Sequence, residues 1–340
     1  MTSELDFGDQ VKDSDSESEK SSREKRLEEL QQKKKLMSKH ITEDKVCQLR
    51  SEIMDEKSYL KYLLINVSNY NFKNWSECFP NNKVYLKPLI TGKSWFEFFD
   101  SISSKNFFRE IEIYLSSCLK EEQKVVPYPE LVFNAFNVLP LDKVRVVFLG
   151  QDPYINSMTV DNKCIPQATG FSFSVPSGYP KPPSLSNINK NLVDFSHITK
   201  ISESGCLISW IMQGCLMVNS AFTTIMGESA AHQRIWAPFA QALISYLNTK
   251  CKNLVFVAWG KKAYELCQDV DQDKHCLIVS SHPSGYSYQQ PMSAFSIKKR
   301  TQLNFDAFVS VDHFGRINRY LESKKKAKIY WGDIGDHLSI

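Results

Sequence analysis

The stretch VRVVFLGQDPYIN, residues 144–156, joins an apolar run to a carboxylate whose backbone is restrained. Residues 144–149 are β-branched and aliphatic, as in a parallel strand that is covered on both faces. Gly150 ends this run, and Asp152 follows with Pro153 directly behind it. Because a residue that precedes proline is held extended, the backbone of Asp152 has little freedom to swing. The sequence therefore predicts an acid fixed in place just past the end of a buried strand.

Helical and strand-like segments alternate along most of the chain. Helical patterns cover residues 94–102, 106–119, 184–195, 234–248, 263–268 and 313–323, and further apolar strands are expected at 215–220, 253–260 and 275–283. Strands separated by helical crossovers favour a parallel sheet with helices on both faces. We expect an α/β fold with a central, twisted, four-stranded parallel sheet in three α/β/α layers. In such sheets, ligands bind beyond the carboxyl ends of the strands.

Composition excludes several classes of protein. No run of about eighteen apolar residues is present and the first residues are polar, so we expect neither secretion nor membrane insertion. The nine cysteines include no C-x-x-C pair, which argues against a zinc site, an iron–sulfur cluster or a disulfide framework. The net charge of +4 does not by itself indicate a nucleic-acid partner.

The sequence divides into three regions. Residues 1–42 have few aromatics and many charges, which predicts a disordered tail. Residues 43–92 are expected to form an accessory segment, helical at first and then irregular. Residues 93–340 carry the alternating pattern and form the expected catalytic domain.

Polar side chains stand just past each expected strand. A lone acid or imidazole at such a place is usually a helix cap or a solvated group. Several of them at one edge of a sheet favour a binding site. The residues concerned are Gln151, Asp152, Tyr154, Asn219, Lys261, His282 and Ser284.

Six motifs place these residues in a known pattern. GQDPY (150–154), TGFSFSV (169–175), PPSL (182–185), QGCLMVNSAFT (213–223), VFVAWG (255–260) and HPSGYS (282–287) resemble, in order, the motifs of family 1 uracil-DNA glycosylases. The resemblance runs from about Trp95 to Trp331. It implies an enzyme that flips uracil out of DNA and hydrolyses its N-glycosidic bond, which leaves an abasic site and starts base-excision repair. It implies no metal and no cofactor.

The resemblance also assigns roles around the flipped base. Phe173 matches the residue that stacks on uracil, and Asn219 matches the reader of its N3–H and O4. Tyr154 would exclude the methyl group of thymine by overlap, and Gln151 would add contacts to the base. A wrong base would leave buried polar groups unpaired, which supports strong discrimination.

Two residues would carry the chemistry. His282 matches the imidazole that donates to uracil O2 as negative charge develops there. Asp152 matches the carboxylate that faces the oxocarbenium-like sugar and orients the attacking water.

Five further positions are expected to contact DNA. Small hydroxyl residues would hold phosphates and fix register without reading sequence. A cation beside them would do similar work, and an aromatic wedge would fill the gap left by the base. The hydroxyls are Ser184, Ser284 and Ser287, the cation is Lys261 and the wedge is Tyr286.

The chain departs from the family pattern at several places, which include Gly285 and Tyr286 in the wedge loop and Lys261. Ile155 stands where a histidine usually helps to hold the water, so slower turnover is expected. Insertions are expected near residues 156–166 and 288–312. Lys298, Lys299 and Arg300 in the second insertion are expected to contact phosphate beyond the usual footprint.

Two alternatives remain open from the residues alone. One is a DNA-binding scaffold in which catalysis has declined, and the other is a nucleotide-handling α/β hydrolase, which is remote because no G-x-x-x-x-G-K-[ST] motif is present. The expected partner is uracil-containing DNA, single- or double-stranded, with the tail available for replication or repair proteins. The expected state is a monomer, in the nucleus or at a cytoplasmic site of viral DNA replication.

Overall fold

A four-stranded parallel sheet with strand order β5-β2-β7-β8 forms the centre of the protein. The computed structural model describes residues 65–332. The strands are β2 (Val146–Gly150), β5 (Cys215–Asn219), β7 (Val255–Trp259) and β8 (Cys276–Ser280). Every residue of β2, β5 and β7 is buried, because helices cover both faces of the sheet. The predicted fold class is confirmed.

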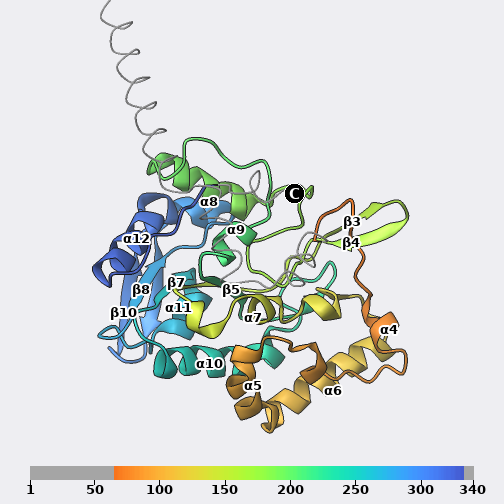
Figure 1. Cartoon of the computed structure of the whole chain (residues 1–340). Helices are drawn as coiled ribbons and strands as arrows, with labels where there is room; N and C mark the ends of the chain where they lie inside the picture. The colour runs from red at the N-terminus through yellow and green to blue at the C-terminus, as the bar shows by residue number, and fades with distance from the viewer. Residues whose placement is uncertain (1–64, 333–340) are drawn as a thin grey trace, which may run out of the picture. The chain divides into compact units, whose positions relative to one another are not determined.

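Helices form a layer on each side of this sheet (Figure 1). On one side lie α8 (Pro183–Asp194), α9 (Ile208–Ile211) and α12 (His313–Ser323). On the other lie α5 (Phe96–Ser103), α6 (Asn106–Lys120), α7 (Asn134–Val138) and α10 (Gln233–Lys250). The short helix α11 (Lys261–Cys267) follows β7 directly, and α4 (Trp75–Cys78) precedes the whole unit.

Aromatic side chains fill the space between the layers. Phe148 of β2 contacts Trp210, with ring centroids 5.9 Å apart, on the side of α9 and α12. On the opposite side Phe222 packs against Trp236 at 5.2 Å and against Phe239 at 4.8 Å. These rings anchor the helices to the sheet by burying large apolar areas.

Three antiparallel pairs of short strands form separate two-stranded sheets. β1 (Val125–Val126) pairs with β6 (Thr224–Ile225), β3 (Ser157–Val160) with β4 (Lys163–Pro166), and β9 (Met292–Ser296) with β10 (Thr301–Phe305). The segment expected as an excursion at 156–166 is the β3–β4 hairpin. Its two turn residues, Asp161 and Asn162, have φ of 48° and 62°, which suits a tight hairpin turn. The second expected insertion contains β9 and β10.

Residues 65–92 pack onto the rest of the described chain. The Val67 backbone N–H donates to the Ser177 carbonyl at 2.9 Å, and the Trp75 indole N–H donates to the Pro127 carbonyl at 2.9 Å. The chain divides into two units, Met1–Val46 and Cys47–Ile340, and all described residues belong to the second. The expected tail at 1–42 and the expected helix up to residue 64 lie outside the described residues.

Among residues 65–332, no helix combines the length and apolarity that spanning a bilayer requires.

Two fully buried histidines are held neutral by their surroundings. His313 accepts from the Trp259 indole N–H at 3.2 Å, and its other ring nitrogen contacts the Phe308 carbonyl at 3.2 Å. His232 contacts the Thr223 hydroxyl at 2.9 Å. Burial lowers the pKa of His232 to about 4 and that of His313 to about 3. For neither ring does a nearby carboxylate offset the effect of burial on the pKa.

We expect these two histidines to make folding sensitive to acid. In the unfolded chain both would titrate near pH 6.5, so the unfolded state binds more protons than the folded state below that pH. Their stabilising contribution is complete above pH 6.5 and is lost as the pH falls toward 4. Urea unfolding at pH 7 and pH 5 measures this, with an expected loss of about 2 kcal/mol for each imidazole. An unfolding free energy that stays constant over this range would contradict the assignment.

Candidate active site

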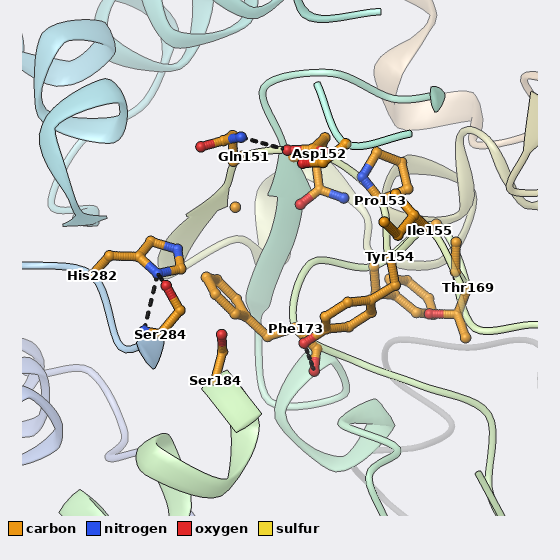
Figure 2. Close-up of a pocket in the computed structure, with 16 residues that line it drawn as sticks. Gln151, Asp152, Pro153, Tyr154, Ile155, Thr169, Phe173, Ser184, His282 and Ser284 are labelled. Carbon is orange, nitrogen blue, oxygen red and sulfur yellow. Dashed lines mark hydrogen bonds between the residues drawn. The ribbon is translucent and has the colours of Figure 1, made fainter. Parts of the chain in front are cut away.

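The ends of β2, β5 and β8 converge on one pocket of about 250 Å³ (Figure 2). A volume of this size suits a small planar ligand better than a drug-sized one. Most of the residues expected from the sequence line it together. They are Gln151, Asp152, Tyr154, Phe173, Ser184, Asn219, His282 and Ser284.

The carboxylate of Asp152 is held by four hydrogen-bond donors. Oδ2 accepts from the Ser229 hydroxyl at 3.0 Å and from the Ala230 backbone N–H at 2.9 Å. Oδ1 accepts from the Gln151 side chain at 2.7 Å and from the Gln233 side chain at 3.3 Å. Donors to both oxygens fix the plane of the carboxylate. The acid predicted to be restrained by Pro153 is therefore also restrained through its side chain.

A cation supports this arrangement from outside the pocket. Lys262 at the start of α11 donates to Gln233 Oε1 at 2.6 Å, and Gln233 in turn donates to Asp152. Sequence reasoning missed Ser229, Gln233 and Lys262. Ser229 and Gln233 belong to no recognised motif. Lys262 could not be found from the sequence because it contacts Gln233 and not Asp152 itself.

Asn219 reaches the pocket because Gly150 stands beside it. The two residues pair across β2 and β5, and a Cβ atom at Gly150 would lie 2.1 Å from Asn219 Oδ1. The side chain of Asn219 is 9% exposed at the end of β5. Its amide can therefore face a ligand with both a donor and an acceptor, at a position where water is largely excluded.

Two aromatic residues form a wall of the pocket. The Phe173 ring meets the Trp259 ring edge-on at 5.4 Å and lies 6.2 Å from the His282 ring. The Tyr154 hydroxyl donates to the Phe173 carbonyl at 3.4 Å. Phe173 has a φ of 62°, a left-handed conformation that is rare for a bulky side chain and clusters at functional sites.

The imidazole of His282 presents a donor to the pocket. Its Nδ1 accepts from the Ser284 backbone N–H at 3.1 Å and contacts the Ser284 hydroxyl at 2.7 Å. A backbone N–H can only donate, so the proton of the neutral ring lies on Nε2. Burial lowers the pKa of His282 to about 4, against the opposing attraction of Asp152. The ring is therefore a neutral N–H donor at ordinary pH.

Four of the five predicted DNA-contacting residues line the pocket or a hollow beside it. Ser184 lies in the first turn of α8. The Asn187 side chain of the same helix donates to the Pro283 carbonyl at 2.7 Å, which connects α8 to the loop that carries His282 and Ser284. Lys261 and Ser287 line an adjoining hollow of about 290 Å³ that shares Gln151, His282 and Ser284 with the pocket.

Tyr286 and Ile155 take different positions at this site. Tyr286 lines neither hollow, and its side chain is 83% exposed. Ile155 does line the pocket, where it offers an apolar surface next to Asp152. Within residues 65–332, no group of three or more histidine, cysteine, aspartate or glutamate side chains is arranged to hold a metal ion.

Comparison with known proteins places this geometry in a family. Residues 136–307 match the model of the Uracil DNA glycosylase superfamily. A probable uracil-DNA glycosylase of Acanthamoeba polyphaga mimivirus is 49% identical over 272 residues, which are 80% of this chain and 73% of that protein. The uracil-DNA glycosylase of Caenorhabditis elegans is 33% identical over 254 residues, which are 74% of this chain and 81% of that protein.

A solved structure shows the same fold. The crystal structure of mimivirus uracil-DNA glycosylase superposes with a TM-score of 0.77 at 49% identity, and the match covers 80% of this chain and 98% of that chain. A variant of the viral enzyme in complex with UGI superposes with a TM-score of 0.76 over 79% of this chain. On the sequence match, the shared fold and the converging strand ends, this chain belongs to the uracil-DNA glycosylase superfamily.

Proposed function

We propose that this chain is a uracil-DNA glycosylase, a monofunctional hydrolase that removes uracil from DNA and so starts base-excision repair. The observation that carries the proposal is one pocket that joins an amide, a fixed carboxylate and a neutral imidazole, in a chain whose relatives are named uracil-DNA glycosylases. A base inside a duplex cannot reach such a pocket, so the target nucleotide must first be flipped out of the stack.

Base recognition is assigned to the apolar wall and the amide. The Phe173 ring stacks on the base, and Asn219 accepts from N3–H and donates to O4 of uracil. Cytosine presents the opposite pattern and would leave a buried amide unpaired. Tyr154, whose hydroxyl is tethered to the Phe173 carbonyl, fills the space in which the methyl group of thymine would lie.

His282 acts on the departing base. As the N-glycosidic bond breaks, negative charge collects on uracil O2, and the Nε2 proton of His282 is directed into the pocket to meet it. Because the ring is buried and pre-oriented by Ser284, no reorganisation is needed when the charge develops.

Asp152 acts on the sugar. Its carboxylate stabilises positive charge on the oxocarbenium-like ring and accepts a proton from the attacking water. Ile155 cannot hydrogen-bond that water through its side chain. The Ser229 hydroxyl, 3.0 Å from Asp152 Oδ2, supplies a polar group at the same carboxylate. Phosphates of the DNA backbone are bound by Ser184, Ser284, Ser287 and Lys261. These contacts hold the flipped nucleotide in register.

Replacement of Asp152 tests the reaction. Asp152→Asn should lower kcat for uracil release from a uracil-containing oligonucleotide by about 10²- to 10⁴-fold, because the amide cannot accept the proton of water. Free uracil and abasic sites are measured in the presence of a chelator. If wild type and Asp152→Asn released equally little uracil, the protein would be a scaffold that has lost catalysis.

The ionisation of His282 gives a second test. With its pKa lowered to about 4 by burial, the ring should stay neutral, with its proton on Nε2, from pH 8 down to pH 5. Nitrogen NMR of the ¹⁵N-labelled imidazole reports both properties directly. Titration near pH 6.5, or a proton on Nδ1, would contradict the role of His282 as a neutral donor.

The exposed tyrosine gives a third test. Tyr286→Ala should lower kcat/KM on double-stranded uracil DNA far more than on single-stranded DNA, because only the duplex leaves a gap that a wedge must fill. Cleavage of the two substrates is compared in parallel, with Tyr85→Ala as a control at another exposed tyrosine. Equal losses on both substrates would remove the wedge role.

A further inference from the structure

The free edge of the central sheet has unused backbone groups. The Cys276 N–H donates to the Leu254 carbonyl, and the Ser280 carbonyl accepts from the Gly260 N–H. The backbone N–H and C=O groups of the even-numbered residues of β8 therefore point toward β7. Because the backbone groups of successive residues alternate in direction, those of Leu277 and Val279 point away from β7. Within residues 65–332, the backbone N–H and C=O groups of these two residues have no hydrogen-bond partner.

A groove lies on this side of β8. The Ser281 N–H donates to the Asp306 carbonyl at 3.1 Å, which ties the end of β8 to the end of β10. In the described region the two strands do not pair beyond that point. Residues of both strands line a groove of about 700 Å³, which we call the β8–β10 groove. Its apolar lining is Tyr264, Val270, Leu277, Val279, Leu303 and Phe305.

Three cations and three carboxylates line the β8–β10 groove. Lys298 and Lys299 stand at the tip of the β9–β10 hairpin, and Arg316 comes from α12. None of the three forms an ion pair among the described residues. The carboxylates that face them are Asp271, Asp273 and Asp306, of which Asp271 pairs with Lys274 at 3.7 Å.

We propose that the β8–β10 groove binds an extended, acidic peptide segment of a partner protein. The segment adds a strand to β8 through the backbone groups of Leu277 and Val279. Its alternate apolar side chains enter the groove, and its acidic residues face Lys298, Lys299 and Arg316. At about 3.3 Å per residue, four or five residues are enough to run along the edge that β8 offers.

The position of the groove favours a peptide over DNA. The Ile297 N–H donates to the Gln268 side chain at 2.9 Å, just past the end of α11, whereas Lys261 at the start of α11 lines the hollow beside the active site. The hairpin tip is thus separated from the site by the length of the helix, about 10 Å. Phosphates would satisfy the lysines, but they would leave the β8 edge unpaired and the apolar lining uncovered.

A designed peptide tests the proposal on the full chain. Fluorescein-labelled EEVTVTVEE should bind saturably in fluorescence anisotropy, and amide hydrogen exchange should show protection of Leu277 and Val279. The same peptide with its central valine replaced by proline, and KKVTVTVKK, should each bind at least about tenfold more weakly, because one loses the N–H for pairing and the other its charge match. Equal binding of the proline peptide, or no protection of these amides, would overturn the proposal.

Charge reversal tests the contribution of the two lysines to the groove. Lys298→Glu/Lys299→Glu should weaken peptide binding by about tenfold. Lys120→Glu/Lys124→Glu changes the net charge equally at two exposed lysines elsewhere and should leave peptide binding unchanged. Equal weakening by both pairs would overturn the proposal. So would protection of Leu277 and Val279 by duplex DNA in place of the peptide, because the groove would then be a DNA surface.

Discussion

The close approach of β2 and β5 at Gly150 and Asn219 is the constraint on which the site depends. A side chain at Gly150 would occupy the place of the Asn219 amide. The pairing continues past the strands, since the Ser220 N–H donates to Gly150 and the Ala221 N–H donates to Gln151, at 2.9 and 3.0 Å. Asn219 and Asp152, the proposed base reader and catalytic acid, are therefore set at a fixed separation by backbone hydrogen bonds.

Asp152 and His282, the two groups proposed to carry the reaction, are held by different physical means. Asp152 is surrounded by donors from Gln151, Ser229, Ala230 and Gln233, which fix the orientation of its carboxylate. His282 is buried, and the backbone of Ser284 occupies its Nδ1, which favours a neutral ring. In the proposed reaction, a carboxylate beside the sugar and a neutral donor beside the base complement the charges that develop on each fragment.

Additions to the fold leave this centre intact. The β3–β4 hairpin follows the GQDPY motif at 150–154, and the β9–β10 hairpin follows the HPSGYS motif at 282–287. Neither interrupts a strand of the central sheet, since both lie in connections past strand ends, where insertions are tolerated. The second hairpin, however, leaves β8 as an open edge beside a charged groove, and open edges are usually covered in native proteins.

The sequence alone determined the sheet, its layers and most of the pocket. Apolar runs mark buried strands, and parallel strands bring their carboxyl ends to one edge, so Asp152, Asn219 and His282 could be placed together from local patterns. Tertiary structure alone decided which groups hold Asp152, since Ser229 and Gln233 lie 77 and 81 residues away and are positioned by the packing of the segment that starts α10. It also decided the burial of His282 and the open edge of β8. These properties depend on contacts between segments that no local pattern encodes.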